Sequence, residues 1–260
     1  MKFIVTDTRR AVYEALVATL GTLNVPDVEV EIHNSPVARF DSKGVCFVNG
    51  GNSLGVMSGK LDSELSRLVP EAEMDVVKVI KRWGSTSRDG HKYLPLFSAL
   101  MSASRDRTRW LCTAPCMFTP GPGDFRNTRN SFHSTHTALS LIRESLRAGC
   151  PINTVVMTGM CTGRGRTNRM EAAKQMMEAF RLVFVDNKLA TDPAMASHPR
   201  LLLNPLYTLQ PLTPANEPFQ TLHQYRTAGG AMEHKLPPPH DAPVIRSGGS
   251  KERSQFMTLS

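Results

Sequence analysis

The stretch "CFVNGGNSLGVMSGKLD" (residues 46–62) passes from a continuous apolar run into a turn rich in glycine and asparagine, and it ends at a carboxylate. The run "GVCFV" (44–48) is typical of a strand that is buried on both faces. Glycines let a backbone approach an anion closely and present successive N–H groups to it. The stretch therefore predicts a phosphate-binding loop at the end of a central strand.

A second loop of the same kind is "TGMCTGRGRTN" (158–168), which lies between the apolar run "INTVVMTG" (152–159) and a predicted helix at 167–180. The N-terminus of a helix has unpaired N–H groups and a positive dipole end, so it suits a phosphate. We expect Gly163 in this loop to hold a positive φ and to allow close approach of the backbone. Both loops follow buried strands, and ligands bind at the carboxyl ends of strands in open α/β sheets.

The rest of the first 190 residues alternates between strand and helix patterns. Further strands are predicted at 2–5, 28–32, 93–101 and 109–114, and further helices at 12–20, 70–84 and 131–149. Pro95 indicates an edge or a bulge in its strand. This alternation predicts an α/β fold with three layers, in which helices cover both faces of a mixed, mostly parallel sheet.

The pattern ends near residue 187, and we expect a domain at 1–190 followed by an extension at 191–260. Proline is frequent in this extension, and "KLPPPHDAPVIRSGGSKERS" (235–254) has no apolar periodicity. We therefore expect a Pro-rich, largely irregular or disordered tail, above all over its last 45 or so residues. No apolar run is long enough for a membrane span, and "MKFIVTDTRR" is typical of a first strand rather than a signal peptide.

The chain of 260 residues has a formal net charge of +8, which favours anionic partners such as nucleotides. The basic surface permits nucleic-acid binding, but no nucleic-acid motif is present, so we do not favour it. The five cysteines are irregularly spaced and predict reduced thiols in an intracellular, cytoplasmic or nuclear protein. Cys112 and Cys116 lack the further ligands of a metal site, and we expect neither a metal nor a cofactor.

Two known phosphate motifs match the loops poorly. A Walker A loop needs four residues between its glycines and a hydroxyl after the lysine, whereas "GVMSGK" has three residues there and Leu61 follows Lys60. A dinucleotide-binding turn matches "GRGRTN" (163–168) in part, but Asn168 replaces its third glycine. The remaining interpretation uses both loops together, because two glycine-rich turns can hold a diphosphate from two sides.

At this point the chain resembles the macro domain family, whose members bind ADP-ribose. The resemblance lies in "FVNGGNSLGVMSGKLD" (47–62), in "APCMFTPGPGDFRNTRNSFHSTHTAL" (114–139) and in "TGMCTGRGRTNRMEAAKQM" (158–176), and it covers residues 1 to about 187. It is closest to phage and microbial members. It implies that the chain binds ADP-ribose or an ADP-ribosylated protein.

The resemblance also implies a set of site residues. Asn52 would contact the distal ribose, Asn34 would stand in for the family's adenine-binding aspartate, and the two loops would hold the ribose and the diphosphate. The implied ligand contacts are Asn34, Asn49, Asn52, Ser53, Gly55, Val56, Met57, Ser58, Gly59, Gly159, Met160, Cys161, Thr162, Gly163, Arg164 and Gly165. Lys60 stands where similar members have glycine, and it is expected either to pair with a phosphate or to narrow the pocket.

The resemblance leaves open whether the chain is a binding module or an enzyme. An enzyme would be an ADP-ribosyl hydrolase or an ADP-ribose 1″-phosphate phosphatase, with Asp62 orienting water and Asn52 positioning the ribose. Each residue also has a simpler interpretation. Asn49 and Asn52 can stabilise the turn through their own side chains. Asp62 can cap a short helix that follows the loop.

Overall fold

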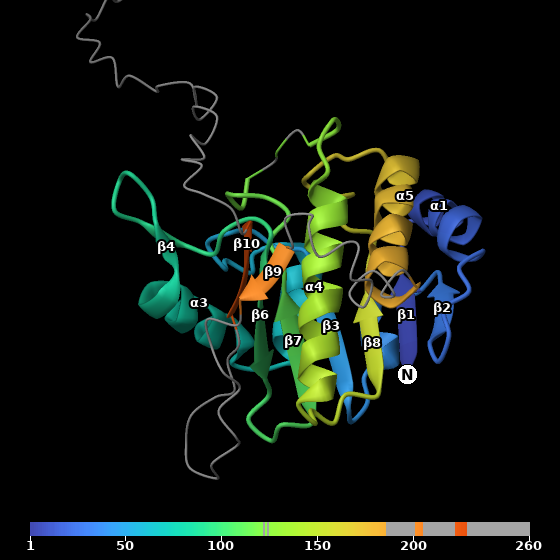
Figure 1. Cartoon of the computed structure of the whole chain (residues 1–260), viewed down its shortest axis with the longest axis horizontal. Coiled ribbons are helices and arrows are strands. Elements are labelled where there is room, and N and C mark those ends of the chain that lie inside the picture. The colour runs from blue at the N-terminus through green and yellow to red at the C-terminus, as the bar shows by residue number, and fades with distance from the viewer. Residues whose placement is uncertain (122, 124, 186–200, 205–221, 228–260) are drawn as a thin grey trace, which may run out of the picture. The chain divides into compact units, whose positions relative to one another are not determined.

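The computed structural model describes residues 1–121, 123, 125–185, 201–204 and 222–227. Helices and strands alternate over much of this part of the chain, except that two helices follow one another over 60–83 and that four strands follow one another over 85–113 without a helix (Figure 1). None of the helices described is long and apolar enough to cross a membrane.

Eight of the described strands form one large sheet of mixed direction. Its members are β1 (Lys2–Thr6), β2 (Glu29–His33), β3 (Val45–Asn49), β6 (Ser98–Ala103), β7 (Arg109–Thr113), β8 (Thr154–Met157), β9 (Leu201–Asn204) and β10 (Leu222–Thr227). Their order in space is β2-β1-β8-β3-β7-β6-β10-β9. The five strands from β2 to β7 are parallel, and β6, β10 and β9 continue the sheet in antiparallel pairs. A short hairpin of β4 (Ser85–Thr86) and β5 (Lys92–Tyr93) lies apart from this sheet.

Helices cover both faces of the sheet, so the domain has three layers. Cys46 and Val48 of β3 pack in one core with side chains from α1 (Arg10–Leu20), α4 (Asn130–Arg147) and α5 (Arg169–Phe180). Val45 and Phe47 point the other way and pack with η1 (Val37–Phe40) and α2 (Lys60–Leu68). On that second face α3 (Ala72–Trp83) packs against Leu100 of β6. The continuous apolar run at 44–48 is thus a strand that is buried on both faces.

The predicted α/β fold is confirmed. Each strand and helix that the sequence predicts in the first 190 residues is present, with boundaries that differ by a few residues. The strand that contains Pro95 begins only at Ser98, after the proline. The helix α5 continues into a turn of π-helix at Arg181–Val185.

Two strands of the 191–260 extension are described, and they take part in the sheet. β10 pairs with β6, so that Leu222 lies opposite Leu100, and β9 pairs with β10. The sequence did not predict these strands. The remainder of the expected tail, including 228–260, lies outside the described residues.

Candidate functional site

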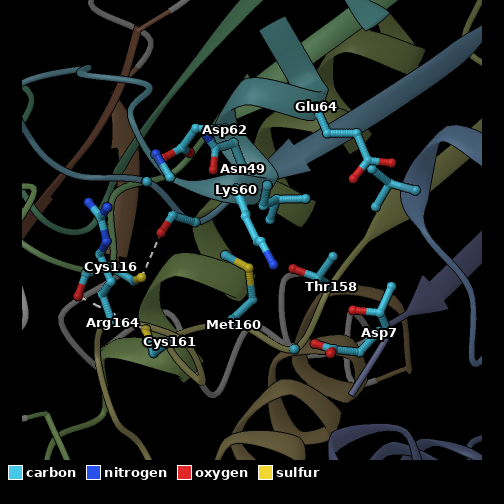
Figure 2. A pocket seen from close by; sticks show the side chains of 18 of the residues that line it. Asp7, Asn49, Lys60, Asp62, Glu64, Cys116, Thr158, Met160, Cys161 and Arg164 are labelled. Atoms are coloured by element: carbon cyan, nitrogen blue, oxygen red, sulfur yellow. Dashed lines mark hydrogen bonds between the residues drawn. The ribbon is translucent and has the colours of Figure 1, made fainter. Parts of the chain in front are cut away.

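A pocket of about 860 Å³ lies at the carboxyl ends of the parallel strands. Its walls are the segments that directly follow β1, β2, β3, β7 and β8, together with the first turns of α2. The lining residues are 7–9, 35–37, 49–52, 59–62, 64, 67, 116, 117, 120, 158–161, 163 and 164 (Figure 2). The two glycine-rich loops therefore face the same pocket, at the edge of the sheet where the sequence places them.

The first loop contributes only part of its predicted residues to the pocket. Asn49, Asn52, Gly59 and Asp62 line it. Ser53, Gly55, Val56, Met57 and Ser58 do not.

The side chain of Asn52 is used to close the first loop. Its amide Nδ2 donates to the carbonyl of Val56 (2.7 Å), and its Oδ1 accepts from the N–H groups of Leu54 (3.1 Å) and Val56 (3.3 Å). These bonds match the turn-stabilising interpretation of this asparagine. The side chain is only 4% exposed, so its contribution to the pocket is small.

The residues between Asn52 and Gly59 contact other parts of the domain and do not face the pocket. Gly55 has a φ of +72°, and a Cβ there would lie 2.8 Å from Cγ1 of Val76 and 2.9 Å from Cδ1 of Ile80. Met57 packs in the core between the sheet and α2. The N–H of Met57 donates to Oε1 of Glu73 (2.9 Å), which fixes the loop to α3.

The second loop places more of its predicted residues in the pocket. Gly159, Met160, Cys161, Gly163 and Arg164 line it, whereas Thr162 and Gly165 do not. The guanidinium of Arg164 donates to the carbonyl of Pro120 (2.6 Å) and approaches Oγ of Ser58 at 3.4 Å. Arg164 thereby joins the second loop to the first loop and to the segment after β7.

Gly159 and Gly163 of this loop both line the pocket, but they differ in whether the surrounding structure leaves space for a side chain. A Cβ at Gly159 would lie 2.6 Å from Cγ1 of Val12, so this position needs glycine for packing. Gly163 has no positive φ, and a Cβ there would meet no atom within 4 Å. The expectation of a positive φ at Gly163 is therefore wrong, and neither the backbone conformation nor the packing of the described residues requires glycine at this position.

The carboxylate of Asp62 turns back to its own helix. Its Oδ2 accepts from the N–H of Gly59 (2.9 Å), the N-cap residue directly before α2. This is a capping contact, and it corresponds to the simpler of the two interpretations of Asp62. The first turn of α2 still borders the pocket, because Gly59, Lys60 and Leu61 also line it.

The sequence interpretation missed a carboxylate and an arginine at the end of β1. Asp7 is only 5% exposed and lines the pocket. Arg9 holds both of its oxygens, with Nε–Oδ1 at 2.9 Å and Nη2–Oδ2 at 2.7 Å. The guanidinium of Arg9 also donates to the carbonyl (2.8 Å) and to Oγ1 (2.6 Å) of Thr162. Their position directly after a parallel strand was a signal that could have revealed them.

Asn34 lies outside the pocket lining. Its Nδ2 donates to the backbone carbonyl of Asp7 (2.6 Å), which supports the segment that carries the carboxylate. Ser35, Pro36 and Val37 are the residues that form the pocket wall after β2.

Lys60 extends into the pocket. In Figure 2 its ammonium end lies beside Met160 and Thr158, on the floor formed by the end of β8. No ion pair between described residues includes Lys60. A cation in such a position attracts a negatively charged ligand group. Within the described residues there is no cluster of His, Cys, Asp or Glu that could hold a metal ion.

Several solved structures are similar to this chain in fold. The macrodomain of Mycobacterium tuberculosis DarG is 17% identical, with a TM-score of 0.44, and the match covers 57% of this chain and 88% of that chain. The macrodomain of Thermus aquaticus DarG is 16% identical, with a TM-score of 0.41, over 54% of this chain and 83% of that chain.

An Oceanobacillus iheyensis macrodomain, the mutant G37V with ADPR, is 14% identical, with a TM-score of 0.40, over 54% of this chain and 69% of that chain. No protein-family model matches the chain, and no curated protein matches it. All three structures are described as macrodomains.

Proposed function

We propose that the pocket binds ADP-ribose, either free or as an ADP-ribosyl group on a protein. The observation that carries this proposal is that both glycine-rich loops line a single pocket of about 860 Å³. Pockets for ligands of this size commonly measure about 300–1,000 Å³. A ligand with a diphosphate at its centre fits two loops that approach from different strands.

Backbone donors and one lysine support the placement of the diphosphate. Within the described residues, the N–H groups of Cys161, Gly163 and Arg164 donate to no other group. The first turn of α2 adds further N–H groups and the positive end of the helix dipole. Figure 2 shows the ammonium of Lys60 directed toward Thr158 in the same pocket, where it would add a positive charge that attracts the diphosphate.

The far end of the pocket suits the base. The carboxylate of Asp7 borders this end, and Pro36 and Val37 form an apolar wall beside it. A carboxylate accepts a hydrogen bond from an exocyclic amino group such as that of adenine, and an apolar wall packs against the ring. Oδ1 of Asp7 already accepts from the N–H and Nε of Arg9, but Oδ2 accepts only from Nη2 and keeps a lone pair, so Asp7 can take the base-recognition role that the sequence interpretation gave to Asn34.

The geometry favours binding over hydrolysis. An ADP-ribosyl hydrolase or an ADP-ribose 1″-phosphate phosphatase of the kind first considered would use Asp62, but that carboxylate bonds the N–H of Gly59 instead. Asn52 is likewise committed to its own loop. A binding module needs neither side chain to face the ligand.

Calorimetric titration with ADP-ribose, AMP and NAD tests this function. We expect ADP-ribose to bind with micromolar affinity, about −8 kcal/mol. AMP should bind more weakly, because it has one phosphate and reaches only part of the pocket. Equal affinity for AMP and ADP-ribose would contradict a site in which both loops hold the diphosphate.

A further inference from the structure

Two of the five cysteines stand together in the wall of the pocket. Cys116 follows β7 and Cys161 belongs to the second glycine-rich loop, and both line the pocket. Their exposed fractions are 1% and 5%, so each is reached from the pocket and not from the outer surface. All five cysteines are free thiols in the structure, as the sequence predicts.

The fold holds these two side chains against each other. The thiol of Cys161 lies 4.0 Å from the carbonyl of Cys116, and both pack with Met117 and Phe125 in one small cluster. Cys116 is fixed to the first loop, because its thiol donates to the carbonyl of Gly50 (2.8 Å) and its N–H to that of Gly51 (3.1 Å). Cys161 has a φ of +60°, an uncommon value for a residue other than glycine.

The surroundings of Cys161 favour its protonated form. Burial raises the pKa of the Cys161 thiol well above its usual range, and the adjacent Cys116 thiol raises it further. A protonated thiol is a poor nucleophile, so reaction with an oxidant is slow. The proximity of the second thiol nevertheless provides a partner as soon as either sulfur has been oxidised.

We propose that Cys116 and Cys161 are a modification site, at which a peroxide that enters the pocket converts the two thiols to a disulfide. One thiol attacks the O–O bond of hydrogen peroxide and becomes a sulfenic acid, with release of water. The second thiol then attacks that sulfur, the S–O bond breaks, and a second water leaves. The two sulfurs are oxidised by two electrons in all, and the peroxide is reduced to two waters. A small dithiol reverses the step by thiol–disulfide exchange.

The disulfide would join the segment after β7 to the second glycine-rich loop. Because Cys116 is already bonded to Gly50 and Gly51, the cross-link also ties that loop to the first one. Since both thiols are reached through the pocket, a ligand in the pocket would shield them. This shielding rests on the proposed function, whereas disulfide formation does not.

The other cysteines provide an internal comparison. Cys46 and Cys112 are completely buried in the core beneath α4, and neither lines the pocket. Burial raises the pKa of Cys46, and the adjacent Cys112 raises it further, so this second pair is also close. It differs from the first pair in having no opening to the pocket. Cys150, just after α4, is half-buried and packs against the core that contains Cys46 and Cys112, and it does not line the pocket.

The test exposes the full-length, reduced protein to hydrogen peroxide, then denatures it and labels the remaining thiols with N-ethylmaleimide. The chain has five cysteines, so the reduced protein carries five labels and a single disulfide leaves three. We expect three labels, with peptide mapping to show Cys116 joined to Cys161. Cys116→Ser and Cys161→Ser should each keep all four of their thiols, whereas Cys150→Ser should still lose two. Five labels on the wild-type protein, or a disulfide between any other two cysteines, would overturn the proposal.

A second arm adds ADP-ribose at roughly twenty times its Kd, which should slow disulfide formation about 20-fold because only the free protein reacts. If calorimetry shows no ADP-ribose binding but the Cys116–Cys161 disulfide forms, the proposed function fails and the modification site stands. If ADP-ribose binds and the rate of disulfide formation is unchanged, access through the pocket is wrong.

Discussion

Two glycines of the site illustrate how a single residue type serves the fold at one position and a ligand at another. Gly55 is required by its φ of +72° and by the close side chains of Val76 and Ile80. Gly163 borders the pocket and has open space around it. The sequence alone does not separate these cases, because both are glycines in glycine-rich loops.

The first prediction compares Gly163→Val with Gly55→Val. A valine at position 163 occupies the open space at the pocket wall, so we expect loss of measurable ADP-ribose binding with an unchanged melting temperature. A valine at position 55 must adopt a strained backbone and meets Ile80, which should lower the free energy of unfolding by at least about 1–3 kcal/mol. Calorimetry and thermal melts measure both effects. Full affinity in Gly163→Val would remove the second loop from the site.

The second prediction concerns Asp62. If the carboxylate only caps α2, Asp62→Asn keeps stability and ADP-ribose affinity near the wild-type values, because the amide oxygen of asparagine can still accept from the N–H of Gly59. Asp62→Ala should lose about 1 kcal/mol of stability. Release of ADP-ribose from a modified protein is followed alongside. Wild-type turnover that falls at least about 100-fold in Asp62→Asn would reveal a general base and contradict the capping role.

The third prediction concerns Lys60. Replacing its ammonium in Lys60→Met should weaken ADP-ribose binding roughly 10- to 100-fold, the usual value of one charged hydrogen bond. The loss should shrink at high salt, since ions screen the charge. Arg10→Met is the matched control, because Arg10 is highly exposed on α1 and pairs with Glu14 outside the pocket. An affinity that is the same for Lys60→Met and wild type would show that this ammonium does not contact the ligand.

The sequence predicted the position of the site better than its individual contacts. The two loops could be recognised from their glycines and from the strands before them, and they do line one pocket. The orientation of Asn52 and Asp62 could not be predicted, because each has a polar partner nearby in its own loop. Asp7 directly follows β1 and could have been recognised from that position, whereas the pairing of β1 with β8, which lies far away in the sequence, could not.

At the scale of a single element, α4 carries the clearest dependence on pH. Burial lowers the pKa of His136 on this helix to about 4, with further lowering by His133 and Arg143. Burial also lowers the pKa of His133. The ring of His136 stacks on that of Phe132, with centroids 5.6 Å apart. The folded state therefore holds His136 neutral at pH values where the unfolded chain is protonated.

The fourth prediction follows from this shift. The unfolded chain takes up a proton near pH 6.5 and the folded state only near pH 4, so stability falls as the pH drops through this window. The full loss is roughly 3 kcal/mol, and it is absent above the unfolded pKa. His136→Phe keeps an aromatic ring on Phe132 and should flatten the dependence. His91→Asn, at an exposed turn, should not. Denaturant titrations at several pH values between 4 and 6.5 measure the free energy of unfolding of each protein. If this free energy falls equally steeply with decreasing pH in His136→Phe and in the wild type, the prediction is wrong.

The regular elements could be predicted because local patterns determined them. The helices repeat apolar residues every three to four positions, and the parallel strands are continuous apolar runs. β9 and β10 escaped prediction because "LLLN" and "LHQYRT" are short and stand among prolines. Their pairing depends on the free edge of β6, which lies over one hundred positions earlier in the chain.

At the scale of the whole molecule, the last prediction concerns the extension. An irregular tail could be deleted without effect on the domain, but deletion of residues 216–260 removes β10 and exposes the edge of β6. Three residue pairs join the two strands, from Leu222 opposite Leu100 to Gln224 opposite Ser98. At about 1 kcal/mol for each hydrogen bond, we expect a loss of roughly 2–3 kcal/mol, or about 5–10 °C in melting temperature.

Deletion of residues 229–260 is the control, because it keeps β10 and should change neither the melting temperature nor ADP-ribose affinity. Identical melting temperatures for the two truncated proteins would show that β10 does not stabilise the sheet.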